Sequence, residues 1–324
     1  MSGPEAGAPG PAPAAGKGRL KVVARWSLRA AAVVFVVLAG RDMIERWGDS
    51  HIELHAGLAA LSCLPLFAGF VIQGYSWISL IEHMSGKRVP KGPALAVFLA
   101  SQLARYMPGK VGLPLVRMEG APRLGQQPAL VGISVFPETL SWAATGAMLG
   151  FALLTLSSHA AGLAGLVGRL AVPLLVASAL GMLVLLAVDR SRFPKRLRNW
   201  LAPGGEGPLV PVAVPLIQLV YWVLFAVHGY LMSLALGANG SAAMSGVGFY
   251  VIAPVAGFVV VAAPAGLGVR EAVLLAGLGP TLGSAGALGA ALFSRALSLA
   301  MEVASWFVVR LVWGGERAVR SASE

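Results

Sequence analysis

The chain is poor in charge, in cysteine and in aspartate. Charged residues make up 12% of it, whereas soluble domains average about 25%, so an ordinary soluble domain is excluded. The single cysteine, Cys63, excludes an intramolecular disulfide and a cysteine-based zinc site. All three aspartates lie outside the apolar runs, which excludes an aspartyl pair within the membrane. They are Asp42, Asp49 and Asp189.

The motifs of several enzyme classes are also missing. The chain has no HExxH sequence, no Walker A sequence and no Ser–His spacing typical of a hydrolase. We therefore expect no catalytic residue, no metal and no cofactor. The net charge of +11 does not indicate nucleic-acid binding, because the basic residues are sorted into particular loops of an otherwise apolar chain.

Long apolar runs dominate what is present, since 57% of the residues are hydrophobic. A membrane-spanning helix needs roughly 20 apolar residues, and several runs reach that length. The sequence predicts an all-α polytopic membrane protein with a disordered tail over residues 1–18 and a second tail over 316–324. The predicted spans are 27–40, 56–81, 128–156, 162–188, 209–236 and 286–312.

Two further apolar segments are broken by proline and glycine. The first runs over 94–107 and continues as Pro108-Gly-Lys-Val-Gly112. Its helical part would rise about 21 Å, which is only part of a hydrocarbon core of about 30 Å. The second runs over 242–263 and continues as Pro264-Ala-Gly-Leu-Gly268, and its first arm is long enough to span alone. We predict that each segment forms a re-entrant hairpin.

The placement of the basic residues favours this topology. With two hairpins, most lysines and arginines fall on the side of the N-terminus, as the positive-inside rule requires of the cytoplasmic side. If the first broken segment spanned the membrane, the basic loop after residue 188 would lie outside. We therefore expect both termini in the cytoplasm. The cytoplasmic set includes Lys87, Arg88, Lys91, Arg117, Arg123, Arg190 and Arg192.

The two halves of the chain also resemble each other. Glu138 follows Pro108 by 30 residues, and Arg295 follows Pro264 by 31 residues. Because each half would hold three spans, the second half would be inserted upside down. In many transporters with such inverted repeats, broken helices meet near the membrane midplane and form the substrate site. The predicted repeats cover about 19–157 and 158–315.

Five charged residues fall inside apolar segments, where a charge costs roughly 2.5–3.5 kcal/mol and ordinarily faces a cavity or a partner. After each break a helix begins, and its unpaired N–H groups and positive dipole end suit an anion. Cations flank both breaks, so we predict a site for a phosphate headgroup. The five residues are Arg105, Glu138, Arg270, Arg295 and Glu302, and Lys110 lies within the first break.

These stretches resemble a known family, the flippase-like transmembrane domain of lysylphosphatidylglycerol synthases. The likeness is carried by 101–112 with Arg117 just after it, and by 264–271 with Arg295 and Glu302 downstream. It extends over about residues 25–315. The resemblance implies a lipid-translocating domain, here 19–315, without the aminoacyl-transfer domain of the bifunctional members. One departure is that Leu113-Pro114 stands where the family often has a polar residue.

The resemblance and the charges together predict a transporter in the bacterial cytoplasmic membrane that moves a phosphate-bearing lipid between leaflets. The lipid would be an aminoacylated phospholipid or a polyprenyl-phosphate-linked lipid. The other expected partners are a separately encoded lipid-modifying enzyme and further copies of the chain, with no nucleic acid. The predicted substrate-binding residues are Arg105, Pro108, Gly109, Lys110, Gly112, Glu138, Pro264, Gly266, Gly268, Arg270, Glu271, Arg295 and Glu302.

Other interpretations of the same residues stay open. Arg295 and Glu302 lie seven residues apart on one helix face and could neutralise each other, while Glu271 could cap a helix. A non-transporting accessory subunit would use the charges for assembly, and a lipid-linked glycosyl- or phosphotransferase would use the 41–53 loop or the 189–208 loop. Hydrogen bonds between helices are the expected role of Gln73, Gln102, Gln218 and His228.

Overall fold

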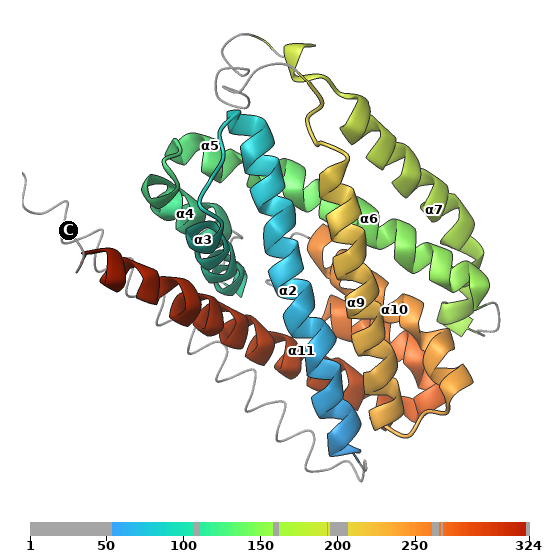
Figure 1. Ribbon diagram of the computed structural model, residues 1–324. Coiled ribbons are helices and arrows are strands. Elements are labelled where there is room, and N and C mark those ends of the chain that lie inside the picture. The colour runs from blue at the N-terminus through green and yellow to red at the C-terminus, as the bar shows by residue number, and fades with distance from the viewer. Residues whose placement is uncertain are drawn as a thin grey trace, which may run out of the picture.

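The structure is a computed structural model that describes residues 54–106, 111–157, 162–192, 194, 207–260, 266 and 268–321. Within these ranges the chain forms helices and one isolated bridge, between Asp189 and Pro208, and no strand (Figure 1). The predicted all-α class is therefore confirmed. The predicted tail over 1–18 and the predicted span over 27–40 lie outside the described residues.

The longer helices follow the apolar runs. In chain order they are α2 (Ala56–Ser85), α3 (Lys91–Leu103), η1 (Ala104–Tyr106), α4 (Gly112–Gly120), η3 (Ala121–Leu124), α5 (Pro128–Ile133), α6 (Val135–Leu156), α7 (Gly162–Ala187), η4 (Arg190–Arg192), α9 (Ala213–Ala235), α10 (Gly240–Val259) and α11 (Val269–Ser321). The helix α11 is two helices joined at a kink, because Gly283 has a φ of 70° and a ψ of 170°, a conformation open mainly to glycine.

Six helical stretches in the described ranges are long and apolar enough to cross a membrane. Four of them, made by α2, by α5 with α6, by α7 and by α9, match predicted spans. The predicted span 286–312 is the part of α11 after the kink. The helix α10 is also long enough to cross, as its sequence allowed. Whether it pairs with the start of α11 as a re-entrant hairpin stays a prediction, and so do the inverted repeats.

The first broken segment has short arms on both sides of the break. The helix α3 has 13 residues and α4 has nine, so each rises no more than about 20 Å. Neither arm can cross a hydrocarbon core of about 30 Å alone. These lengths agree with the predicted partial crossing, although the hairpin itself stays a prediction.

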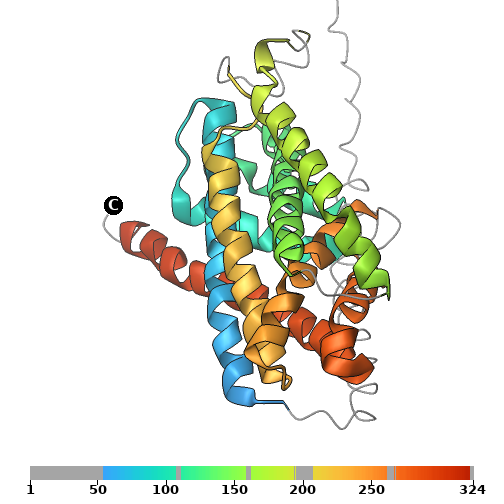
Figure 2. The same cartoon turned by 90° about the vertical axis from the view of Figure 1, so that its right-hand side faces the viewer.

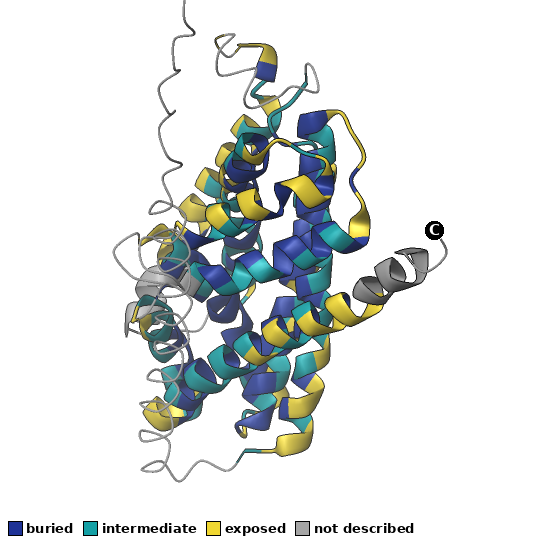
Figure 3. Ribbon diagram, turned by 90° about the vertical axis from the view of Figure 1, so that its left-hand side faces the viewer, coloured by how far each residue is buried: buried dark blue, intermediate teal, exposed yellow. Residues whose placement is uncertain are grey.

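At the centre of the molecule α2 lies along α9, with α6 and α7 on one side and α3, α4 and α5 on the other (Figures 1 and 2). The helix α11 crosses this group near one end and then continues away from it. Trp77 of α2 and Trp222 of α9 are fully buried in the core. Exposed residues are frequent on α7 and on the far part of α11 (Figure 3). Many of these are large and apolar, which suits a surface in contact with lipid tails.

Candidate functional site

A cavity of about 430 Å³ lies where the predicted intramembrane charges meet. It is bounded by residues of α2, α3, η1, α4, α6, α9, α10 and α11, so both halves of the chain contribute to it. Four arginines and one carboxylate line it, which gives its wall a positive balance. These residues are Arg105, Arg117, Arg270, Arg295 and Glu138.

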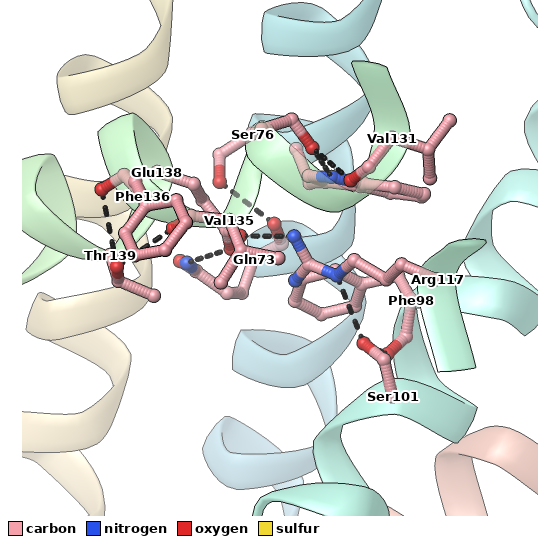
Figure 4. A network of polar contacts seen from close by, with 12 residues as sticks. Gln73, Ser76, Phe98, Ser101, Arg117, Val131, Val135, Phe136, Glu138 and Thr139 are labelled. Carbon is pink, nitrogen blue, oxygen red and sulfur yellow. Dashed lines mark hydrogen bonds and ion pairs between the residues drawn. The ribbon is translucent and has the colours of Figure 1, made fainter. Parts of the chain in front are cut away.

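The pair Arg117–Glu138 is the most deeply buried ion pair of this wall. The side chains are 0% and 3% exposed, and the Arg117 Nη1 lies 2.5 Å from the Glu138 Oε2. The Arg117 Nε donates to the Ser101 hydroxyl at 3.1 Å, and Gln73 donates to the other Glu138 oxygen at 3.4 Å (Figure 4). These contacts replace much of the hydration that both charges lose on burial.

Aromatic rings complete the surroundings of Arg117. Its guanidinium lies 4.6 Å from the ring centre of Trp77 and 5.1 Å from that of Phe98. A planar cation over an aromatic face is stabilised electrostatically in a desolvated site. The position therefore suits arginine in charge, shape and stacking, and not lysine.

The sequence did not predict Arg117 as a site residue, because its position after a short apolar run assigned it to the cytoplasmic basic set, and that assignment stays a prediction. The structure places it in α4 with a fully buried side chain. The indication in the sequence was the apolar stretch on both sides of it, from Val111 to Met118. A charged side chain inside such a stretch can be buried in the protein even when the stretch is too short to span a membrane.

Arg295 pairs with Glu271, which also caps α11. The Arg295 Nη1 lies 2.6 Å from the Glu271 Oε1, and the Gly268 N–H donates to the Glu271 Oε2 at 2.8 Å. A glutamate three residues into a helix that binds the N–H of the capping residue is half of a capping box. Glu271 therefore satisfies one of the N–H groups of this helix start, as its capping interpretation predicted.

Glu302 pairs with Arg105 across the two halves of the chain. The Arg105 Nη2 bonds to the Glu302 Oε1, and the two side chains are 33% and 0% exposed. The partner of Glu302 is thus Arg105 of η1, and the alternative of a pair with Arg295 on the same helix face is wrong. Arg105 lines the cavity, whereas Glu302 lies behind it.

Arg270, which lines the cavity, and His228 both contact the Ser294 hydroxyl group. The Arg270 Nη2 donates to the Ser294 Oγ at 2.8 Å, and its guanidinium lies 5.9 Å from the Phe225 ring centre. The His228 Nε2 lies 3.2 Å from the same Ser294 oxygen, and its Nδ1 lies 3.2 Å from the Ser62 carbonyl. The predicted interhelical role of His228 is confirmed.

The polar residues around Glu138 also join helices. The Gln218 Nε2 donates to the Glu138 carbonyl at 3.2 Å, and the Ser141 hydroxyl donates to the Gln218 side chain at 2.7 Å. The predicted interhelical roles of Gln73 and Gln218 are therefore confirmed. Gln102 differs, because it accepts a bond from Arg105 only three residues along the chain, and it lines the cavity.

At the second break, two glycines allow the backbone to approach α10. Gly266 has a φ of 72°, and a Cβ on it would lie 2.8 Å from the Gly257 Cα. Both residues line the cavity. Any larger side chain at Gly266 would meet a backbone atom and would hold a conformation that L-residues rarely adopt. The sequence predicted Gly266 as a site residue but offered no indication of Gly257.

Aromatic side chains form another large part of the cavity wall, and the sequence did not predict this. They come from α2, α6, α9 and α10, whereas the arginines come from η1, α4 and α11. Trp142 lies 5.9 Å from Phe258, ring centre to ring centre. The cavity is therefore amphipathic. Its aromatic lining residues are Phe70, Phe136, Trp142, Tyr221, Phe225 and Phe258.

The structure brings together five of the thirteen predicted site residues in the cavity wall, namely Arg105, Glu138, Gly266, Arg270 and Arg295. Glu271 and Glu302 each bind one of these arginines from behind the wall. Gly268 precedes α11, and Gly112 is a buried residue at the start of α4, next to Leu113 of the wall. The other four lie outside the described residues and are Pro108, Gly109, Lys110 and Pro264.

In the described part of the chain, no three His, Cys, Asp or Glu side chains are close enough to hold a metal ion. Cys63 is partly buried within α2, and its thiol lies 3.6 Å from the Ala59 carbonyl oxygen. The cavity wall itself offers arginines that can bind charge and aromatic rings that can bind apolar groups.

Comparison with known proteins supports the resemblance noted in the sequence. A family model, described as the lysylphosphatidylglycerol synthase TM region, matches residues 21–305. No curated protein matches the chain. The match takes in both broken segments and every charged residue of the cavity wall, and with the apolar helices it identifies a multi-pass membrane protein. The chain belongs to the lysylphosphatidylglycerol synthase transmembrane-region family.

Proposed function

We propose that the protein is a lipid transporter that moves a phosphate-bearing lipid between the leaflets of the bacterial cytoplasmic membrane, with both termini in the cytoplasm. The charge of the cavity carries this proposal, because its wall holds four arginines and one glutamate. Even with Glu271 and Glu302 behind the wall, four cations face three carboxylates. In a site of low polarity such an excess strongly favours an anion.

The headgroup would bind between η1, α4 and α11. Arg105 of η1, Arg117 of α4 and Arg270 of α11 all line the cavity. The Arg117 Nη2 is buried and has no hydrogen-bond partner among the described residues. Buried donors of this kind are rare and need a partner, and a phosphate oxygen of the lipid would supply one.

The start of α4 adds a second feature that suits an anion. The capping residue Val111 offers no side-chain hydrogen bond to the first turn, so the N–H groups of Gly112 and Leu113 would be open to a ligand, whereas Pro114 has no N–H. Leu113 of that turn lines the cavity. The positive end of the α4 dipole is thus next to the proposed phosphate position. At α11 the corresponding place is taken by Glu271, so the two breaks would contribute unequally.

The lipid tails would stay largely outside the cavity. A volume of about 430 Å³ lies within the range of roughly 300–1,000 Å³ typical of small-molecule sites, which suits a headgroup. Two apolar residues of the wall, Phe136 and Val259, are 64% and 67% exposed at the surface. Tails that leave the cavity past these residues would remain in contact with apolar groups and with surrounding lipid.

The proposed substrate is an aminoacylated phospholipid or a polyprenyl-phosphate-linked lipid, since both place a phosphate at the membrane surface. A lipid-modifying enzyme encoded separately would produce or consume that lipid, and further copies of the chain are a second proposed partner. No nucleotide-binding sequence is present, so we assign the driving force to an ion gradient or to consumption of the lipid after transport.

The test is lipid movement in liposomes that contain the purified protein. A fluorescent phosphatidylglycerol should change leaflets faster than in protein-free liposomes and should be recovered chemically unchanged. Arg105→Gln and Arg270→Gln should each slow this movement at least tenfold. Arg310→Gln is the matched control, because Arg310 lies on α11 over the Trp306 ring and outside the cavity, and it should leave the rate unchanged.

The same assay separates the alternative functions. A chemically altered lipid would favour an enzyme. No movement across a panel that includes aminoacylated and polyprenyl-phosphate lipids would favour a non-transporting accessory subunit, in which the ion pairs only hold the helices together. Equal slowing by the Arg310 variant would show that loss of any arginine has this effect and would contradict the assignment of the cavity.

A further inference from the structure

Only one of the two carboxylate oxygens of Glu302 has a hydrogen-bond partner among the described residues. Its side chain is 0% exposed, and its Oε1 receives the bond from Arg105. Its Oε2 is buried and has no hydrogen-bond partner among the described residues. A buried ionised carboxylate ordinarily has both oxygens satisfied, so the balance of this group depends on the single bond to Arg105.

Arg105 is far less confined than Glu302. Its side chain is 33% exposed, it lines the cavity, and it belongs to a short 3₁₀ turn at the end of α3. Glu302 does not line the cavity. A headgroup in the cavity can therefore draw Arg105 toward itself but cannot bring a cationic group of its own to Glu302.

Binding of a phosphate by Arg105 would thus leave a buried negative charge without a counter-charge. Such a state is strongly unfavourable, and a buried carboxylate in this position ordinarily takes a proton instead. The Glu302 Oε2, which has no hydrogen-bond partner among the described residues, can accept that proton. When Arg105 turns toward the phosphate, it also uncovers the route from the cavity to Glu302, and water in the cavity supplies the proton.

We propose that Glu302 is the proton-binding residue that couples headgroup binding to a proton gradient. In the empty site Glu302 is ionised and holds Arg105. When the phosphate binds, the Arg105–carboxylate bond breaks, one proton bonds to Glu302, and the Arg105 N–H groups donate to the phosphate. Release of the headgroup reverses both steps, so one proton moves with each headgroup. The inference rests on the proposed function and names its coupling ion.

Several other titratable and charged groups on elements that pack against α11 have partners of their own. The arginines and glutamates of the cavity form the pairs described above, and His228 of α9 has both ring nitrogens bonded. Farther from Glu302, α2 contributes Glu82, whose carboxylate accepts from the Val89 N–H, and His83, which bonds to the Pro208 carbonyl. The remaining ones are Cys63, Tyr75, Lys91, Arg169, Tyr221, Tyr230 and Tyr250.

The first experiment uses the unaltered protein. In weakly buffered detergent solution near neutral pH, addition of short-chain phosphatidylglycerol should remove about one proton from solution for each lipid bound, as a pH-sensitive dye records. In liposomes, movement should accelerate as pH falls, by at most about tenfold per pH unit for one proton. Binding without proton uptake would overturn the inference and leave the proposed function intact. The absence of any lipid binding or movement would instead overturn the proposed function.

Variants then assign the proton to one residue. Glu302→Gln mimics the protonated state, so its lipid movement should no longer vary with pH and its binding should take up no proton. Glu271→Gln removes the carboxylate of the other arginine pair of α11 and should keep the pH dependence, because Glu271 is 17% exposed and remains hydrated. Glu119→Gln, at an exposed position of α4, should change neither the rate nor its pH dependence. A Glu302→Gln protein with the wild-type pH profile would overturn the inference.

Discussion

The two halves of the chain carry the same ion pair with the charges exchanged, and the two pairs differ in burial. In the first half, Arg117 of the arm after the break binds Glu138 of the next span. In the second half, Glu271 of the arm binds Arg295 of the next span. The first pair is 0% and 3% exposed, whereas the second is 13% and 17% exposed.

The neighbours of the two pairs explain this difference. Arg117 and Glu138 are enclosed by the Ser101 hydroxyl, the Gln73 amide and the rings of Trp77 and Phe98. Glu271 instead shares its carboxylate with the start of its own helix. The Arg117–Glu138 pair is therefore enclosed on several sides, whereas the Arg295–Glu271 pair stays partly exposed. The two corresponding pairs thus differ in how completely their surroundings enclose them.

The largest expected effect is the loss of one partner from the enclosed pair. Glu138→Gln leaves the Arg117 charge buried and should lower the free energy of unfolding by about 3–5 kcal/mol. A thermal unfolding scan in detergent would record this as a marked fall in midpoint. The double variant Arg117→Met/Glu138→Gln should recover part of the loss because it removes the unpaired charge. A Glu138→Gln protein as stable as the wild type would remove the distinction between the two pairs.

The next largest effect is expected from disturbing the close backbone contact between Gly266 and Gly257 at the second break. Gly266→Ala forces a positive φ on an L-residue and drives its Cβ against Gly257, which should cost about 1–3 kcal/mol. The control is Gly181→Ala in α7, where a Cβ meets nothing within 4 Å. That substitution should leave stability unchanged or raise it by up to about 1 kcal/mol. Equal behaviour of the two variants in a thermal scan would contradict the role assigned to Gly266.

Much of the fold was predictable because it depends on local properties. Hydrophobic length alone located α2, α6, α7, α9 and the later part of α11, since a spanning helix needs a minimum apolar run. Intramembrane charge located Arg105, Glu138, Arg270 and Arg295, which now share one cavity. Both kinds of property belong to short windows of sequence.

The partners of these charges were not predictable, because they depend on how distant helices pack. Arg105 and Glu302 are separated by 197 positions, and no window of sequence joins them. Arg117 was missed as a residue of the cavity wall because α4 has only nine residues, too few to give a span-like run. The aromatic part of the wall comes from four helices, and each ring alone resembles an ordinary packing residue.

A smaller effect on stability is expected at the more exposed pair. Arg295→Gln leaves Glu271 partly hydrated and bonded to the Gly268 N–H, so it should cost about 1 kcal/mol or less. Its lipid movement in liposomes should nevertheless fall at least tenfold, because Arg295 lines the cavity. Membrane level and thermal midpoint near the wild type, together with slow transport, would sharpen the comparison. A destabilisation as large as that of Glu138→Gln would show that both pairs hold the fold.

The smallest perturbation tests whether the two halves are inverted at all. In a Cys63→Ser background, single cysteines at Lys91 and Ser241 stand at the starts of α3 and α10, where both side chains are exposed. Exposed substitutions of this kind change stability by no more than about 0.5 kcal/mol.

An inverted repeat places these two equivalent positions on opposite sides of the membrane. A membrane-impermeant thiol reagent should therefore label the cysteine at 241 in intact cells and the one at 91 only after permeabilisation. Parallel repeats would place both helix starts on the same side of the membrane. Labelling of both cysteines from outside would therefore contradict the inverted repeat.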